Sequence, residues 1–282
     1  MTVYPARPPL RFGVIADPQF ADVPPSREHD RFYGRSLGKI AEAVGVFAAE
    51  GVDFVVTLGD LIDRDFVHLA PVLSLYEKLA CPHIVLPGNH DFQVEADRKG
   101  AVHATLGMPA PFYSRAIGGI RFVVIDTTEI ALFSSNPGEP RHDAAVRQLE
   151  QLRASGAPQA MDWNAAMSAE QVIWLAETLA DAERAGERAI VFGHYPLFPL
   201  TDHSLWNAGE VASVIARSPA AIAYFCGHDH RGNYGRKGTT HFLNMHGMVD
   251  TETQNAFAIV TVGDDRIEIE GFGRQVSRTL RL

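Results

Sequence analysis

The stretch Phe54-Val55-Val56-Thr57-Leu58-Gly59-Asp60 is a short apolar run that ends abruptly in glycine and an acid. Short runs of β-branched and aromatic residues closed in this way are typical of buried strands. Four other runs have the same form and also end in groups that bind metal ions. They are residues 12–16 before Asp17-Pro18-Gln19, 84–87 before Gly88-Asn89-His90-Asp91, 190–192 before Gly193-His194, and 222–226 before Gly227-His228-Asp229-His230.

In open α/β sheets, ligands bind beyond the carboxyl ends of the strands. We therefore expect the five endings to meet at one sheet edge, where they would bring carboxylates, amides and imidazoles into one pocket. Taken singly, the residues have ordinary explanations: Asp17, Gly59-Asp60 and Gly88-Asn89 are common in turns, and His194 can be a core histidine. Five such blocks in order on five predicted strand ends argue against coincidence.

The composition limits the kind of protein this can be. A chain of 282 residues, 46% of them hydrophobic, can bury a large core, and we expect a single domain over residues 1–282. Acids outnumber bases by 34 to 25, which argues against a nucleic-acid partner. It does not exclude a phosphate substrate, because bound metal ions can invert the local charge. The oligomeric state is not predicted.

The chain shows no targeting signal in its apolar pattern. No stretch of about 20 apolar residues is present, so we expect no membrane span. Residues 1–9 lack the apolar segment of a secretory signal. Cys81 and Cys226 lie in apolar surroundings, which predicts two reduced, buried thiols and a cytoplasmic location.

Periodicity predicts the other elements. Helices are expected over residues 31–50 (ended by Gly51), 66–79, 142–153 and 208–216, and Ser168 with Gln171 resembles a capping box that opens another helix. A further buried strand is expected over residues 121–126. Residues 241–245, 256–262 and 267–272 alternate like antiparallel strands, with a hairpin turn at 263–266. The long, weakly patterned stretch 127–164 is typical of a functional loop.

The predicted ligands suit a pair of metal ions. Two divalent ions about 3.5–4 Å apart can hold a hydroxide between them and clamp an in-line displacement at phosphorus. Asp60 is the natural bridging carboxylate. Asp17, Gln19 and one of the late histidines can complete one ion's shell, and Asn89, His194 and the other late histidine the second. Such oxygen and imidazole donors suit Mn, Fe, Zn or Mg.

Block by block, over residues 17–230, the chain resembles the calcineurin-like metallophosphoesterases. That resemblance implies an α/β fold, a four-layer α/β/β/α sandwich of two mixed sheets with a dinuclear metal site at one sheet edge. It implies that Asp17, Gln19, Asp60 and His230 hold the first metal, and that Asp60, Asn89, His194 and His228 hold the second. His90 would be the non-ligand histidine that stabilises or protonates the leaving oxygen.

One position departs from the usual motif, because Gln19 stands where most of these enzymes have histidine. A glutamine amide is a weaker donor than imidazole and disfavours ferric iron, so Mn or Mg becomes more plausible. The same glutamine occurs in the manganese-dependent ADP-ribose/CDP-alcohol diphosphatases, which the chain also resembles at residues 12–17, 19–22, 31–33, 36–37, 205–207, 247–249, 255–258 and 271–274. That likeness implies attack of a metal-bridging hydroxide on a phosphoanhydride in a nucleoside-diphosphate conjugate.

Other residues receive less specific roles. Asp63 is expected to brace the site without direct metal contact, and Asp91 either orients His90 or caps the following turn. Phe20, Arg31, His203 and Trp206 are candidate substrate contacts, although packing on the next helix is the commoner role for a residue such as Trp206. Arg31 and Arg141 can pair with a distal phosphate or can be solvated surface. Residues 20–30 and 130–165 are expected to wall the substrate cleft.

Two rival functions remain at this point. A phosphodiesterase or phosphomonoesterase would use the same metals on cyclic nucleotides or small phosphate esters. A binding module that kept the scaffold and lost catalysis is disfavoured, because such modules usually lose metal ligands and here the set is complete apart from the glutamine.

Overall fold

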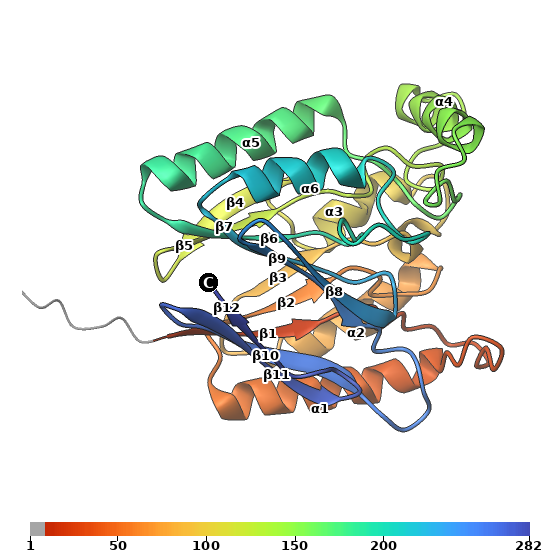
Figure 1. The fold of residues 1–282 in the computed structure, drawn as a ribbon. Coiled ribbons are helices and arrows are strands. Elements are labelled where there is room, and N and C mark those ends of the chain that lie inside the picture. The colour runs from red at the N-terminus through yellow and green to blue at the C-terminus, as the bar shows by residue number, and fades with distance from the viewer. Residues whose placement is uncertain (1–8) are drawn as a thin grey trace, which may run out of the picture.

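The computed structural model describes residues 9–282, and two six-stranded sheets lie face to face in it (Figure 1). In spatial order the first sheet contains β12 (Arg278–Arg281), β11 (Arg266–Gly273), β10 (Ala256–Val262), β1 (Leu10–Ile15), β2 (Phe54–Leu58) and β3 (His83–Leu86). The second contains β4 (Tyr113–Ile117), β5 (Ile120–Val124), β6 (Arg188–Phe192), β7 (Ala221–Cys226), β9 (Thr240–His246) and β8 (Arg231–Lys237). Each sheet has parallel and antiparallel neighbours.

Helices cover the outer face of each sheet, which completes four layers (Figure 1). On the first sheet lie α1 (Ser36–Glu50) and α2 (Leu69–Tyr76), and on the second α5 (Ala169–Arg184) and α6 (Ala208–Arg217). Shorter segments are α3 (Val102–Thr105) and the 3-10 turns η1 (Tyr33–Arg35), η2 (Phe66–His68), η3 (His90–Phe92) and η4 (Lys99–Ala101). The predicted α/β/β/α sandwich of two mixed sheets is confirmed.

Five phenylalanine rings lie at the centre of the core between the sheets, among buried Leu, Ile, Val and Ala side chains. Phe12 stacks on Phe54 with ring centroids 4.9 Å apart, and Phe122, Phe192 and Phe225 of the opposite sheet meet it edge-on at 5.8–6.0 Å. The opposite faces of the strands pack on helices. Because the central strands are covered on both faces, their sequences are unbroken apolar runs and do not alternate with polar residues.

Most predicted helices form, with shifted boundaries. α1 starts at Ser36, later than the predicted start at residue 31, because η1 precedes it; it ends, as predicted, at Gly51, whose φ of 62° suits glycine. α2 ends at Tyr76, short of the predicted 79. The Ser168 side chain accepts the Gln171 N–H at the start of α5, which confirms the capping interaction. Within the long stretch 127–164, α4 (Pro140–Ala154) forms close to its predicted position.

The sequence did not predict three strands, β4, β8 and β12, and all three lie at sheet edges. β8 has the sequence RGNYGRK and β12 has RTLR, and neither contains an apolar run. An edge strand has one side open and tolerates charged residues, so these three lack the signal that marks a central strand. β3, the fourth edge strand, is largely buried and kept its apolar run. One further expectation was wrong: Cys81 is part-exposed, whereas Cys226 is buried as expected, and both are free thiols.

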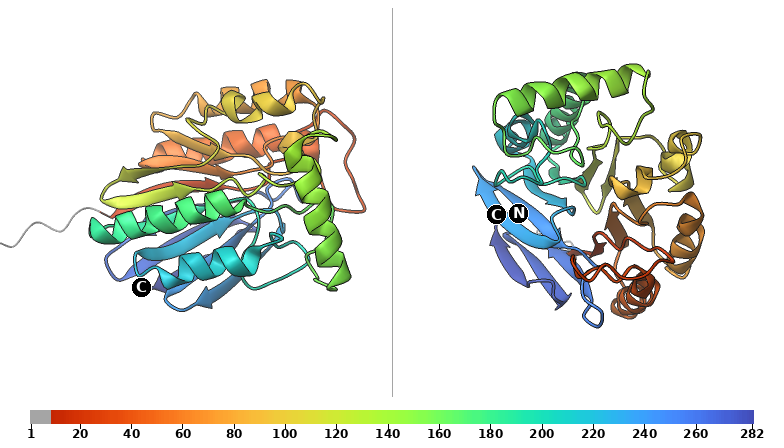
Figure 2. Two further views of the ribbon diagram at one scale, coloured as in Figure 1. Left: turned by 90° about the horizontal axis from the view of Figure 1, so that it is seen from above. Right: turned by 90° about the vertical axis from the view of Figure 1, so that its right-hand side faces the viewer.

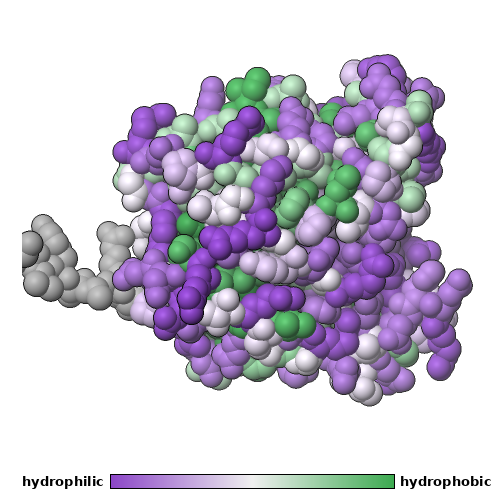
Figure 3. Space-filling view, viewed as in Figure 1, coloured by the Kyte–Doolittle hydropathy of each residue, from purple (hydrophilic) through white to green (hydrophobic). Residues whose placement is uncertain are grey.

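Residues 1–8, most of the segment assessed for a secretory signal, lie outside the described residues. Within residues 9–282, no helix has the length and apolar character needed to cross a bilayer. On the face shown in Figure 3, hydrophobic residues are scattered among hydrophilic ones.

Phe12→Ala should lower the free energy of unfolding by about 3–5 kcal/mol, because it opens a cavity among four other aromatic rings. Urea unfolding followed by circular dichroism measures this. Ile173→Ala on α5 is the control, since Ile173 is 59% exposed and its loss should change stability by no more than about 0.5 kcal/mol. Similar losses in the two variants would contradict this assignment of the core.

Candidate metal centre

The five strand ends that carry the predicted ligands meet at one end of the sandwich, the end that faces the viewer in the right-hand panel of Figure 2. β1, β2 and β3 come from the first sheet, and β6 and β7 from the second. The five endings therefore meet at the carboxyl ends of strands from both sheets. The sequence analysis had expected them at the edge of a single sheet. Backbone hydrogen bonds join the loops: the Gln19 N–H donates to the Asp60 carbonyl (2.8 Å) and the Gly227 N–H to the His194 carbonyl (3.0 Å).

Asp60 lies at the centre and is fully buried. Ligand atoms of Asp60, His194 and His228 all lie within 4.8 Å of one another. His194 Nε2 is 3.4 Å from Asp60 Oδ2 and 3.2 Å from Asn89 Oδ1. Burial alone would raise the pKa of Asp60, but the neighbouring His194 and His90 outweigh it and hold this pKa below its usual range. Asp60 is therefore an ionised carboxylate within reach of His194, His228 and Gln19.

Asp17, Gln19 and His230 form the other half of the centre. Gln19 Nε2 lies 3.1 Å from Asp60 Oδ2 and 3.2 Å from His230 Nε2, and His230 Nε2 lies 3.7 Å from Asp17 Oδ1. Burial is the main reason that the pKa of Asp17 rises to about 6; His230 and His194 oppose it, and Asp60 adds to it. The two buried carboxylates, Asp17 and Asp60, thus repel each other at short range.

This half of the centre also contains an unpaired acceptor. Among residues 9–282, Gln19 Oε1 is buried and has no hydrogen-bond partner. Nε2 of the same amide faces Asp60 and His230, so turning the amide by 180° would direct the unpaired oxygen to that position, where a cation would satisfy it. The side chains present are oxygen and nitrogen donors of the kind that divalent Mn, Mg, Fe or Zn accepts, so the residues fit a metal centre.

Backbone strain concentrates at the same residues. Four predicted ligands have positive φ angles: Asp17 (50°), Gln19 (44°), Asp60 (53°) and His228 (70°). Non-glycine residues rarely adopt this conformation, and they persist in it where surrounding structure and function require it. A glycine serves the same convergence: a Cβ on Gly88 would overlap Asp60 Oδ1 and the ring of His194. At these four ligands the chain turns sharply, which directs their side chains to the centre.

Each imidazole is oriented from behind by one hydrogen-bond acceptor. His194 Nδ1 bonds the Leu58 carbonyl (2.8 Å), and His228 Nε2 bonds Asn164 Oδ1 (3.1 Å). The two Asn164 Nδ2 protons are donated to the carbonyls of Gln159 and Asp202, so its oxygen must face His228. His230 Nδ1 bonds Asp250 Oδ1 (2.8 Å). In His194 and His230 the other ring nitrogen faces the remaining candidate ligands, at 3.2 Å from Asn89 Oδ1 and from Gln19 Nε2 respectively.

Sequence reasoning missed Asn164 and Asp250. Neither belongs to one of the five strand-end blocks. His228 lies 64 residues after Asn164, and His230 lies 20 residues before Asp250, so no local pattern connects them. Only the folded chain brings them to the ligands.

His90 lies beside these ligands without joining them. Its Nδ1 is 2.6 Å from Asp63 Oδ1, and Asp63 Oδ2 accepts Arg64 Nε at 2.9 Å. Asp63 is buried, whereas the His90 side chain is 15% exposed. Asp63 is therefore the residue that orients His90.

Asp91 has neither of the two predicted roles, orienting His90 or capping the following turn. Its carboxylate accepts the N–H groups of Gly88 (2.9 Å) and Ile62 (3.1 Å) and so links the loops after β2 and β3. Burial, with repulsion from Asp60, raises the pKa of Asp91 to about 7. It braces the loop backbone and does not orient the His90 ring.

A cavity of about 400 Å³ opens onto the centre. Six residues of the candidate site line it: Gln19, Asp60, Asn89, His90, His228 and His230. The rest of its wall consists of His29, Arg31, Gln93, Trp163 and His203. Arg31 and His203 thus reach the cavity as predicted, and the expected walls, residues 20–30 and 130–165, contribute His29 and Trp163.

The structure does not bring Phe20 or Trp206 to this cavity. Phe20 packs in the core beneath α1, and Trp206 is 2% exposed and packs on Ala145 and Leu149 of α4. The exposed ring is Trp163, 44% exposed, which the sequence analysis did not single out. Its ring centroid is 6.3 Å from that of His203, which in turn is 5.4 Å from that of His228. A lone tryptophan in a weakly patterned loop carries no sequence signal of this kind.

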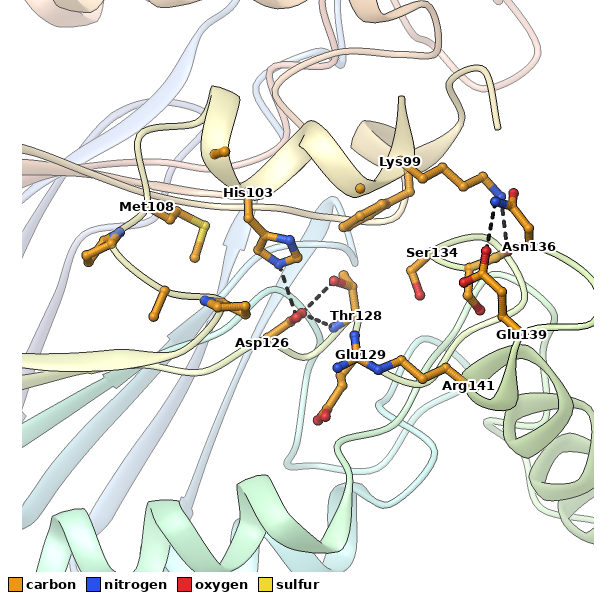
Figure 4. Close-up of a pocket in the computed structure, with 17 residues that line it drawn as sticks. Lys99, His103, Met108, Asp126, Thr128, Glu129, Ser134, Asn136, Glu139 and Arg141 are labelled. Carbon is orange, nitrogen blue, oxygen red and sulfur yellow. Dashed lines mark hydrogen bonds and ion pairs between the residues drawn. The ribbon is translucent and has the colours of Figure 1, made fainter. Parts of the chain in front are cut away.

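Arg141 lines a second cavity, of about 480 Å³, and not the one at the metal centre. Figure 4 shows this second cavity, in which Asp126 bonds Thr128 and His103, and Asn136 bonds Glu139. Lys99 Nζ donates to the Ser135 carbonyl at 3.2 Å. Many of its polar groups are thus already paired with one another.

Comparison with known proteins gives consistent results. The sequence model of the calcineurin-like phosphoesterases matches residues 10–232. The chain is similar to the manganese-dependent ADP-ribose/CDP-alcohol diphosphatases of Mus musculus (24% identity, covering 98% of this chain and 94% of the relative) and Arabidopsis thaliana (26%, covering 96% and 97%). Its fold is similar to the crystal structure of a dimetal phosphatase from Danio rerio, with a TM-score of 0.87, 24% identity and coverage of 97% and 99% of the two chains.

Gly88→Ala should disrupt the centre, because the added methyl group would occupy the space of Asp60 Oδ1 and the His194 ring. We expect a loss of about 1–3 kcal/mol in unfolding free energy and weakened Mn²⁺ binding, measured by chemical unfolding and by titration. Gly45→Ala in α1 is the matched control, since a Cβ there meets no atom within 4 Å. Unchanged Mn²⁺ binding in Gly88→Ala would show that the loops do not converge as closely as described.

Proposed function

This chain belongs to the calcineurin-like phosphoesterase family and is a metal-dependent hydrolase, and we propose that it cleaves the phosphoanhydride of a nucleoside-diphosphate conjugate such as ADP-ribose or a CDP-alcohol. The observation that carries the proposal is the convergence of seven donor side chains from five strand ends on one centre, with a glutamine at position 19; five of the seven line the cavity. The seven are Asp17, Gln19, Asp60, Asn89, His194, His228 and His230.

In this proposal Asp17, Gln19, Asp60 and His230 hold one divalent ion, and Asp60, Asn89, His194 and His228 hold the other. Manganese is the metal named in the relatives, and the amide donor Gln19 suits it. Bound ions supply Lewis-acid chemistry, in that they neutralise phosphate oxygens and lower the pKa of a water that serves as nucleophile.

Hydrolysis breaks one bridging P–O bond and forms one P–O bond to the water oxygen. The products are a nucleoside monophosphate and a second phosphorylated fragment. His90 lines the cavity, and its Nδ1 is tied to Asp63, so Nε2 is available to the departing phosphate oxygen. A phosphate leaves readily as an anion, so His90 mainly stabilises charge; proton transfer from it would add about 10²–10⁴-fold if it occurs.

The side walls of the cavity support a nucleotide conjugate. Trp163 and His203 present ring faces of the kind that stack on a nucleobase. Arg31 offers a guanidinium for a phosphate distal to the scissile bond. Tyr195 Oη donates to the Trp163 carbonyl at 2.6 Å, which anchors this wall next to His194.

A substrate panel tests the function. With Mn²⁺ present, ADP-ribose or CDP-choline should have the highest kcat/KM, ahead of cyclic AMP and p-nitrophenyl phosphate. Asp60→Asn and His90→Ala should each lower kcat for the preferred substrate, the first by removing a shared metal ligand. Fastest turnover of cyclic AMP or of the monoester would replace our proposal with a phosphodiesterase or phosphomonoesterase.

Trp163→Ala should raise KM for the preferred nucleotide conjugate by roughly 5–150-fold, the equivalent of about 1–3 kcal/mol of lost stacking. Steady-state kinetics measure this. Trp163→Phe is the matched control, because it keeps an aromatic face and should retain most of the affinity. An unchanged KM in Trp163→Ala would remove the nucleobase from this wall.

A further inference from the structure

His230 is backed by a carboxylate, unlike the other two candidate ligand histidines. Asp250 Oδ1 lies 2.8 Å from His230 Nδ1, and the two side chains are only 17% and 9% exposed. His194 is backed by the backbone carbonyl of Leu58, and His228 by the neutral amide of Asn164. A carboxylate behind a metal-binding imidazole makes the ring more basic and a stronger donor than a neutral acceptor does.

Gln19, the weakest donor of the set, lies in the same half of the centre as His230. Gln19 Nε2 is 3.2 Å from His230 Nε2, so the glutamine and this histidine face one ion position together. Gln19 brings a neutral amide to that position, with Oε1 buried and unpaired among the described residues. A strong donor and a weak donor therefore occur side by side in one half of the site.

The position of Asp250 is tightly held. Lys39 Nζ donates to the carbonyls of Met248, Asp250 and Thr251, each at 2.8 Å, and Lys39 is 6% exposed. The N–H groups of Met248 and Val249 donate to the carbonyls of Ala16 and Asp17 at 2.9 and 3.0 Å. The segment that carries Asp250 is thus fastened to the end of β1, where Asp17 and Gln19 also lie.

A cation adjoins the outer side of Asp250. Arg274 Nη2 is 3.6 Å from Asp250 Oδ2 and donates to the Gly247 carbonyl at 2.5 Å. The guanidinium lies against Oδ2 and leaves Oδ1 directed at His230. The carboxylate is accordingly preorganised before any metal binds.

We propose that Asp250 is a positioning residue that strengthens His230 as a ligand of the first metal and so makes up for the weak donor Gln19. The inference rests on the proposed function only in that the site must bind two divalent ions. It makes the affinity of the first ion depend on a residue about 230 positions away from Gln19 in the chain.

Mn²⁺ titration of the full-length protein, followed by the electron paramagnetic resonance signal of free Mn²⁺, tests the proposal without any substrate. The wild type should bind two ions. Asp250→Asn keeps the size of the side chain and removes its charge, and it should weaken one of the two ions by about 10–100-fold. Adding Gln19→His to that variant should restore most of the loss, because imidazole is the stronger donor.

Two further variants separate donor strength from packing. Asp250→Glu keeps the charge but not the size, so it should retain tighter binding than Asp250→Asn, whereas a purely structural role predicts that the isosteric Asn is the milder change. Asp202→Asn is the matched control, since Asp202 pairs with His203 Nδ1 at 2.9 Å but His203 is not a candidate ligand. Metal binding should be unchanged in it.

The outcomes distinguish the two proposals. If the wild type binds fewer than two Mn²⁺ ions, the proposed function fails. If it binds two and Asp250→Asn binds both as tightly, or if Gln19→His does not restore the loss, the role of Asp250 is wrong while the function stands.

Discussion

The structure depends on holding two buried carboxylates, Asp17 and Asp60, within one small pocket. Both are fully buried, and burial of ionised groups costs several kcal/mol each unless opposite charge or hydrogen bonds offset it. This cost raises the pKa of Asp17, whereas the imidazoles of His194 and His90 offset it at Asp60. Divalent cations bound there would bring opposite charge to both carboxylates, and they supply the chemistry that hydrolysis of a phosphoanhydride needs.

The rest of the fold serves this constraint. Two sheets packed on a phenylalanine core bring five strand ends to one face, and strained turns at Asp17, Gln19, Asp60 and His228 direct the side chains inward. Hydrogen bonds behind the ligands also hold the cavity wall in place. Asn164 bonds His228 with its oxygen and the Asp202 carbonyl with its nitrogen, so a candidate metal ligand and the loop of His203 share one fixed residue. Preorganisation of this kind is what places reacting groups accurately.

Much of the fold could be predicted because the relevant signals are local. Central strands covered on both faces must be apolar throughout. Helices of ten or more residues are recognised by their hydrophobic periodicity and by their capping residues, such as Ser168 at the start of α5. The edge strands β4, β8 and β12 carried no such signal, because one side of each is open to solvent. The C-terminal strands β9 to β11 were also predicted, although only β11 alternates between buried and exposed residues, and β9 and β10 are buried along almost their whole length.

The sequence by itself determined the candidate ligands, since each is a polar residue placed directly after a buried strand and the order of the blocks is a property of the chain. Tertiary structure alone decided which residues stand behind and around them. Asp250 reaches His230, Asp63 and not Asp91 reaches His90, and Trp163 and not Trp206 faces the cavity. Strand ends are brought together by the regular geometry of sheets, which a sequence pattern encodes. The partners come from irregular loops, whose positions follow only from the packing of the whole chain.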